Sequence, residues 1–182
     1  MNNKRLVKIS KYLSRHLRHD PERIGLQLAP GGWVLVNELL AACKQHNFAL
    51  TRSELNEVVA QNDKQRFSFD ASRTRIRANQ GHSVNVDLQL EPQIPPALLY
   101  HGTGHGAVAS IQNLGLQKMS RHHVHLSTDI ATAKTVGSRW GKPVIFAVDA
   151  ATMDEAGYKF YCSDNGVWLV NSVPPKYLSV VE

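Results

Sequence analysis

The first group of residues that could do chemistry is Arg15-His16-Leu17-Arg18-His19. A planar guanidinium binds a phosphate through two parallel hydrogen bonds, and a neighbouring imidazole can donate or move a proton. The group closes a predicted helix, however, and cations at a helix C-terminus also interact favourably with the helix dipole. The spacing alone therefore favours compensation of the helix dipole, with phosphate binding as the alternative.

Two further polar segments of the first half could extend such a site. Lys64 and Arg66 lie two residues apart, which places them on one face of a predicted strand. The segment Ile76–Ser83 ends in small and polar residues, including Gln80 and His82, a composition typical of a binding loop. A charged strand edge and an ordinary turn are the structural alternatives for these segments.

The second half carries a glycine-rich string, Tyr100–Gly106, and a histidine-rich string, Met119–Ser127. The glycines permit close approach of a ligand to a backbone loop, and His101 and Thr103 offer hydrogen bonds. The first string is neither a P-loop nor a Rossmann fingerprint. Several histidines invite a metal site, but no carboxylate or cysteine lies close in sequence, so no metal is expected.

Three helices and a hairpin must position the first groups. Apolar residues recur at spacings of three and four from Leu6 to Leu17, which predicts a helix with one buried face. Asn37 is the expected N-cap of a second helix, and Thr51 with Glu54 forms a capping box that starts a third. Strands at 66–69 and 74–77 follow, and three helices before a basic hairpin are the outline of a winged helix.

The sequence changes character near residue 90. Residues 84–90 alternate like a strand, and three prolines between 92 and 96 then form a stiff extended connector. The expected organisation is a lobe at 1–90, a linker at 91–97 and a second lobe at 98–182. The second lobe is predicted to be α+β, with strands near 98–100, 124–126, 144–148, 159–161 and 167–170 and helices near 107–113 and 129–136, the last capped by Asp129.

The charge of the chain is uneven. Its 182 residues carry a formal charge of +6, and residues 1–90 hold 14 basic and 8 acidic side chains, whereas the second half is neutral. Such an excess indicates either a polyanionic partner or a merely basic surface. No apolar run could span a membrane, no signal peptide is recognisable, and two cysteines are too few for a disulfide scaffold. A cytoplasmic protein is expected.

Taken together, the strings resemble the RNA 2'-phosphotransferase family. The matching strings are Ile9-Ser10-Lys11 through Leu17-Arg18-His19, Asp63–Phe67, Arg77–Ser83, His101-Gly102-Thr103, Ser120-Arg121-His122 and Val124–Ser127, in family order over nearly the whole chain. The resemblance implies an N-terminal winged-helix lobe that receives RNA and a C-terminal ADP-ribosyltransferase-like lobe that binds NAD as co-substrate.

The resemblance also implies roles for individual residues. Those implied to be catalytic are Arg18, His19, Arg66 and Arg121. Those implied to bind NAD are His101, Gly102, Thr103, His125 and Ser127. Those expected to contact RNA are Arg15, Lys64, Gln80 and His82. The glutamate found in many ADP-ribosyltransferases is missing, since residues 167–169 read Val-Trp-Leu. A phosphate nucleophile needs no glutamate to deprotonate it.

The implied reaction removes an internal 2'-phosphate from RNA, such as a spliced tRNA. It proceeds through an ADP-ribosylated RNA phosphate and yields 2'-hydroxyl RNA, nicotinamide and ADP-ribose 1'',2''-cyclic phosphate. The protein is expected to be a monomer without metal. Two alternatives remain: an ADP-ribosyltransferase that modifies terminal nucleic-acid phosphates or proteins, and a catalytically inactive winged-helix protein that binds nucleic acid.

Overall fold

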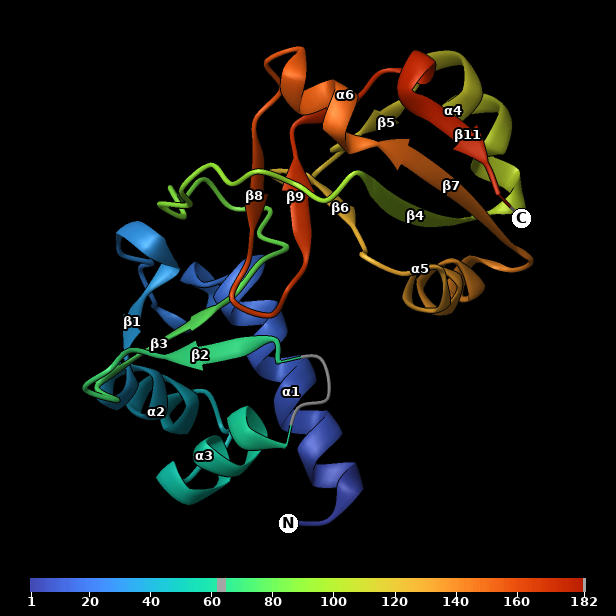
Figure 1. Cartoon of the computed structure of the whole chain (residues 1–182). Helices are drawn as coiled ribbons and strands as arrows, with labels where there is room; N and C mark the ends of the chain where they lie inside the picture. Colours follow the sequence, from blue (N-terminus) through green and yellow to red (C-terminus); the bar gives the residue numbers. More distant parts are fainter. Residues whose placement is uncertain (62–64, 182) are drawn as a thin grey trace. The chain divides into compact units, whose positions relative to one another are not determined.

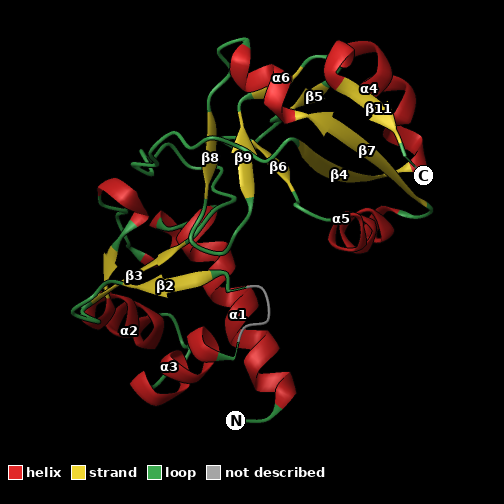
Figure 2. Ribbon diagram, in the orientation of Figure 1, coloured by secondary structure: helices red, strands yellow, loops and turns green. Residues whose placement is uncertain are grey.

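The computed structural model describes residues 1–61 and 65–181, and the chain forms two compact units, Met1–Gln89 and Leu90–Glu182. Both units combine helices with sheets, so the predicted α+β class is confirmed (Figures 1 and 2). Among the described residues, no helix has the length and apolar character needed to cross a membrane.

The first unit packs three α-helices against a small antiparallel sheet (Figure 1). Its helices are α1 (Asn3–Arg18), α2 (Val36–Gln45) and α3 (Arg52–Ala60), with the 3-10 turns η1 (Glu22–Ile24) and η2 (Pro30–Gly32). Its strands are β1 (Val34–Leu35), β2 (Phe67–Phe69) and β3 (Arg75–Ala78), in the order β1-β3-β2. The predicted hairpin is present within one residue of its expected bounds.

The buried stripe of α1 organises this unit. Ile9, Leu13 and Leu17 are completely buried, because their spacing places them on one helix face. The other elements add Leu39, Leu55, Phe67 and Ile76 to the same core. Burial of each of the three α1 side chains contributes about 2 kcal/mol, so the stripe holds in place the helix whose last turn carries Arg18.

Two local predictions for this unit are wrong. Helix α2 begins at Val36, before Asn37, because the Val36 N–H still donates to the Thr74 carbonyl (2.9 Å) and the chain passes directly from sheet to helix. Residues 84–90 form no strand, although their burial alternates. They are held by single backbone hydrogen bonds, such as Gly31 N–H to the Asp87 carbonyl at 2.7 Å, rather than by a ladder.

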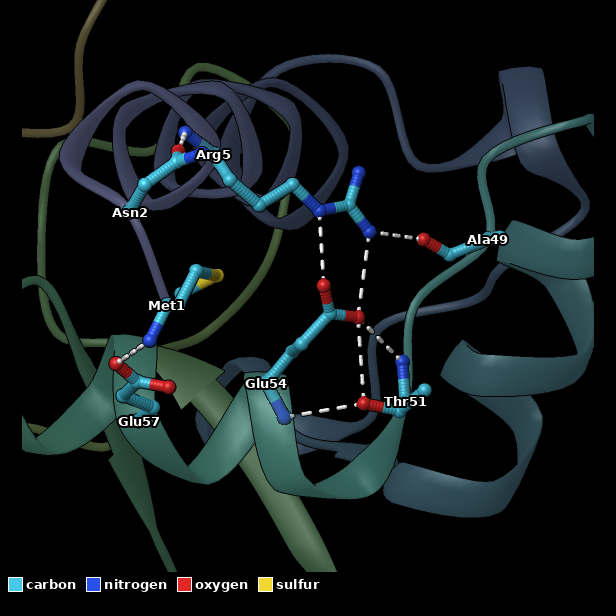
Figure 3. Close-up of polar contacts among 7 residues, drawn as sticks. All are labelled: Met1, Asn2, Arg5, Ala49, Thr51, Glu54 and Glu57. Atoms are coloured by element: carbon cyan, nitrogen blue, oxygen red, sulfur yellow. Dashed lines mark hydrogen bonds and ion pairs between the residues drawn. The ribbon is translucent and has the colours of Figure 1, made fainter.

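An ion-pair network joins α1 to α3 (Figure 3). Arg5 donates to both carboxylate oxygens of Glu54, at 2.9 and 3.2 Å, and also to the Ala49 carbonyl. The predicted capping box is confirmed, since Thr51 Oγ1 accepts the Glu54 N–H (3.2 Å) and Glu54 accepts the Thr51 N–H (3.0 Å). The hydrogen bonds from Arg5 and then from Thr51 lower the pKa of Glu54 to about 2.

The second unit contains several small sheets flanked by helices. Its strands are β4 (Leu98–Gly104), β5 (Leu116–Gln117), β6 (Val124–Leu126), β7 (Pro143–Asp149), β8 (Phe160–Cys162), β9 (Trp168–Val170), β10 (Ser172–Val173) and β11 (Leu178–Val180). Its helices are α4 (Val108–Leu114), α5 (Ile130–Gly137) and α6 (Ala150–Glu155), and its 3-10 turns are η3 (His105–Ala107), η4 (Ser138–Trp140) and η5 (Pro175–Tyr177). The strands pair as β11-β7-β4, β6-β9-β8 and β10-β5.

The five strands and two helices predicted for this half are present, including α5 with its Asp129 N-cap. Helix α6 and strands β5, β10 and β11 were not predicted, because each is short and the strands pair with distant segments. An antiparallel bridge between Tyr100 and Ser127, with both hydrogen bonds at 2.8 Å, connects β4 to the end of β6.

Most of the glycine-rich string, through Gly104, is part of strand β4 rather than a loop, because β4 pairs with β7 along its whole length. His105 and Gly106 belong to the 3-10 turn η3. Gly102 packs against α5, and Gly104 packs against Trp140 of η4. A Cβ at Gly102 would lie 1.7 Å from the Ala133 carbonyl oxygen, and one at Gly137 would lie 2.9 Å from the Thr103 carbonyl oxygen. The backbones of β4 and α5 therefore meet directly.

Replacing Glu54 by Gln should lower the free energy of unfolding by about 1–2 kcal/mol near neutral pH, because the carboxylate shared by Arg5 and the start of α3 is lost. The folded pKa of Glu54 is depressed from 4.5 to about 2. Its contribution is therefore complete above the unfolded pKa and disappears as the pH falls toward 2. Urea denaturation from neutral to acidic pH should show the difference between wild type and variant shrinking. Glu38→Gln, in the first turn of α2, is the control, and a Glu54→Gln difference independent of pH would contradict the assignment.

Replacing Gly102 by Ala should destabilise the second unit by about 3 kcal/mol or more, because the added methyl overlaps the backbone of α5. Gly106→Ala is the matched control, since a Cβ at Gly106 would meet nothing within 4 Å. Thermal denaturation of the two variants measures the difference. Equal melting temperatures would show that the β4–α5 contact does not require a glycine.

Candidate active site

The residues predicted to act on a substrate form two groups, one within each unit. In the first unit, Arg18 ends α1 and connects two loops. Its carbonyl oxygen accepts hydrogen bonds from the N–H groups of Ser83 (2.9 Å) and Val84 (3.4 Å), and its Nη2 donates to the Arg66 carbonyl at 3.5 Å. Gly81 adopts φ +87°, and a Cβ there would lie 3.6 Å from Arg18 Nη1. The end of α1 thus holds the loops on both sides of the hairpin.

His19 lies next to this junction. Its side chain is exposed, and Nδ1 lies 2.9 Å from Ser83 Oγ. Since Ser83 is itself bound to the Arg18 carbonyl, the same loop positions both residues. Ser83 lies in a string that matches the family but was not predicted as a functional residue, because only the folded loop brings it to the helix end.

Arg66 is positioned by a second residue that sequence reasoning missed. The Asn79 N–H donates to the Arg66 carbonyl at 2.9 Å, and Asn79 Nδ2 donates to the Gln65 carbonyl at 2.7 Å. Asn79 is buried, so its two bonds clamp the backbone before β2 against the end of β3. Asn79 therefore positions the backbone from which the half-buried Arg66 side chain extends.

The two arginines of α1 have different surroundings. Arg15 is 53% exposed and pairs with the Asp20 carboxylate at 3.1 Å. Arg18 is half-buried, and its guanidinium lies 5.9 Å from the centroid of the Phe67 ring. Its side chain is therefore held by the fold and is suited to binding one anion in a defined position.

A cavity of about 520 Å³ opens beside His19, within the first unit. Its polar lining comes from His19, Asp20, Glu22, Gln27 and Asn85, and its apolar lining includes Leu26 and Val84. Two carboxylates in the lining disfavour an anion here. The cavity therefore suits an uncharged group better than an anion.

The remaining predicted RNA contacts differ in accessibility. Lys64 lies outside the described residues. Gln80 is half-buried on the loop after β3. His82 is completely buried, and its Nε2 would lie 3.2 Å from a Cβ at Gly32. This places His82 in the packing of the loop rather than on a surface that RNA could touch.

In the second unit, His101 on β4 lies against the strand that carries His125. Its Nδ1 lies 3.0 Å from the His125 carbonyl oxygen. A carbonyl only accepts, so Nδ1 carries the hydrogen and Nε2 is the acceptor of the neutral ring. Burial lowers the pKa of His101, and the charge of Arg121 lowers it further, although the bond to His125 opposes this. The neutral form therefore predominates at neutral pH.

Arg121 stands in the turn before β6 and is exposed. Its Nη1 lies 3.4 Å from His125 Nδ1, and since a guanidinium only donates, the imidazole accepts. Arg121, His125 and His101 thus form one group, in which a cation lies beside two imidazoles. This composition suits a polar ligand that carries negative charge.

The other predicted residues of this unit surround the same strands. Ser127 is fixed by its backbone bridge to Tyr100, and Thr103 is half-buried on β4. Gly102 is buried and faces α5, so its part in any ligand site is to let α5 approach β4. Among the described residues, no cluster of three or more His, Cys, Asp or Glu side chains could hold a metal.

Comparison with known proteins gives the chain its family. A family model described as "RNA 2'-phosphotransferase, Tpt1 / KptA family" matches residues 4–172. A "Probable RNA 2'-phosphotransferase" from Nostoc punctiforme is 67% identical over 181 residues, 100% of each chain. Proteins of the same name from Trichormus variabilis and Streptomyces griseus are 66% and 54% identical, over 100% and 98% of each chain.

The family match covers parts of both units, including the ends of α1, β4 and β6 where the two groups of polar residues lie. The relatives align over nearly their full length, so the similarity is not confined to one unit. The resemblance seen in the sequence strings is confirmed. This chain belongs to the RNA 2'-phosphotransferase family.

Proposed function

We propose that this protein removes an internal 2'-phosphate from RNA and uses NAD as co-substrate. The observation that carries the proposal is the junction at the end of α1, where Arg18 contacts the Arg66 backbone and His19 contacts Ser83. This junction supplies guanidinium groups and an imidazole beside them, which is the equipment that phosphate chemistry requires. Family membership indicates that the phosphate on which these groups would act is an RNA 2'-phosphate.

The proposed reaction has two steps. First, an oxygen of the RNA 2'-phosphate attacks C1'' of the NAD ribose, and the bond to nicotinamide breaks with its electron pair leaving on the neutral nicotinamide. Second, the ribose O2'' attacks phosphorus, and the bond from phosphorus to the RNA 2'-oxygen breaks. The RNA oxygen gains a proton, O2'' loses one, and the products are 2'-hydroxyl RNA and ADP-ribose 1'',2''-cyclic phosphate.

In this proposal, Arg18 and Arg66 bind the 2'-phosphate dianion and hold it for attack, and Arg121 stabilises the negative charge that develops in the second step. A donor aimed at developing charge typically contributes about 3–4 kcal/mol to transition-state stabilisation. His19 is the proposed acid for the departing RNA oxygen. Its contact with Ser83 supports that role, because a proton donor must be held in position.

The proposed NAD site is in the second unit. His101 in its neutral form, with Nε2 as an acceptor, suits a hydroxyl or amide N–H of NAD, and His125, Thr103 and Ser127 add hydrogen-bonding groups. Gly102 acts by packing. Close contact between β4 and α5 holds His101 and Thr103 on one rigid strand, which supports precise binding of a substrate.

We assign the first unit as a winged-helix RNA-binding lobe and the second as an ADP-ribosyltransferase-like lobe. The order of three helices and a hairpin supports the first assignment, and the mixed strands and helices of residues 98–182 support the second. Gln80 and Lys64 stay proposed RNA contacts. Arg15 and His82 are weaker candidates, since Arg15 is paired with Asp20 and His82 is buried.

Incubation of the protein with NAD and an oligonucleotide that carries one internal 2'-phosphate should release nicotinamide and 2'-hydroxyl RNA. Mass spectrometry of the products separates the candidate functions. A stable ADP-ribosyl adduct without cyclic phosphate would indicate an ADP-ribosyltransferase instead. Absence of nicotinamide release by folded protein in excess would overturn the proposal and leave a nucleic-acid-binding function.

Replacing Arg18, Arg66 or Arg121 by Ala should lower the rate of 2'-phosphate removal by about 100-fold or more in each case, because each variant loses a donor to the phosphate. Arg23→Ala is the control, since Arg23 is 61% exposed beside Asp20 and has no proposed role. Single-turnover kinetics measure the rate of each variant, and circular dichroism shows whether each variant is folded. A folded variant with a rate near wild type would remove that arginine from the mechanism.

A further inference from the structure

A further group of arginines surrounds the β2–β3 hairpin and has no part in the proposed chemistry. Arg75 and Arg77 lie on the same face of β3, and the residue between them, Ile76, is completely buried on the other face. The guanidinium carbons of Arg75 and Arg77 lie 5.5 and 4.6 Å from the centroid of the Trp33 ring. One aromatic ring thus holds two cations on the outer face of the hairpin.

The turn of the hairpin carries a second pair. The guanidinium carbons of Arg52, at the start of α3, and Arg73 lie 5.4 and 4.7 Å from the centroid of the Phe69 ring. Arg73 has φ +58°, a left-handed conformation that Gly or Asn adopts at lower cost. The geometry of the turn therefore does not explain an arginine at this position.

The charge of this segment is strongly positive. Residues 67–78 contain three arginines and one carboxylate, Asp70, which accepts a hydrogen bond from Arg75 Nε at 3.0 Å. Arg73 donates to the neutral Asn56 amide oxygen at 3.2 Å. Arg73 and Arg75 are exposed, so their guanidinium N–H groups can reach a phosphate in solvent.

Three of these side chains, the hairpin arginines Arg52, Arg73 and Arg75, are grouped at the turn end of the hairpin, away from Arg66. Arg77 pairs across the strands with Ser68, two residues from Arg66, so it is not counted among them. Arg66 precedes β2, whereas the turn follows β2, and four residues of extended chain span about 13 Å. A phosphate bound near Arg66 therefore lies too far from the turn for the arginines at the turn to bind it as well.

We propose that the hairpin arginines bind the phosphodiester backbone of the RNA substrate outside the nucleotide that carries the 2'-phosphate. The inference rests on the proposed function for the identity of the polyanion. Aromatic rings restrict the rotamers of the arginines, so less conformational entropy is lost when they bind. The surface adds affinity for long RNA, and it leaves the chemistry at the 2'-phosphate unchanged.

The test compares two substrates with the same 2'-phosphorylated step, a trinucleotide and a stem–loop RNA. The double variant Arg73→Gln/Arg75→Gln should raise KM for the stem–loop about 10-fold at low salt and leave kcat and the kinetics of the trinucleotide unchanged. Arg73→Gln alone, which keeps the Arg75–Asp70 pair, should raise KM about 3-fold. Arg139→Gln, which removes an exposed arginine of the second unit, is the control and should change neither.

Direct binding separates this inference from the proposed function. Fluorescence polarisation with an unmodified stem–loop and no NAD should show about 10-fold weaker binding by the double variant. The slope of log Kd against log salt concentration should fall by the amount expected for the loss of about one to two phosphate contacts. Arg73→Lys/Arg75→Lys should keep most of that salt dependence.

Unchanged RNA binding by the folded double variant, or an equal loss on both substrates, would overturn the inference. Inactivity of the wild type on the trinucleotide would overturn the proposed function instead, and the binding measurement would still decide the role of the hairpin.

Discussion

Burial of the apolar stripe of α1 is the constraint on which the first unit depends. Ile9, Leu13 and Leu17 have no exposed surface, so the helix cannot shift or rotate without losing several kcal/mol of burial. The last turn then presents Arg18 to two loops, and the backbone and side chain of that one residue bind both. Burial of this stripe, which ends at Leu17, thereby determines the position of the next residue, Arg18, and of its cation.

A different constraint governs the second unit, where two backbones pack without side chains between them. Gly102 and Gly137 allow β4 and α5 to meet at a distance that any Cβ would prevent. The strand so held carries His101, whose hydrogen bond to the His125 carbonyl selects one tautomer. Strand β4 thus carries both the glycine that packs against α5 and the histidine whose Nδ1 proton is fixed by a hydrogen bond.

The two units differ in their charge. The basic excess of residues 1–90 is placed in defined positions, since arginines lie over Phe67, Phe69 and Trp33 rather than extending freely into solvent. In the second half, neutral overall, burial and Arg121 keep His101 uncharged. Fixed cations suit a polyanion, and neutral imidazoles suit a ligand bound by hydrogen bonds.

The sequence by itself determined the local elements and the family. Spacing of apolar residues predicted α1, the Thr51–Glu54 capping box predicted the start of α3, and ordered short strings predicted the family, because each of these signals is contained within a few neighbouring residues. Tertiary structure alone decided that residues 84–90 form no strand and that the glycine string is part of β4 as far as Gly104, since a strand exists only where a partner supplies its ladder. It likewise decided that His82 is buried, that Asn79 binds the backbone of Gln65 and Arg66, and that Ser83 contacts His19, because these contacts join residues far apart in the chain.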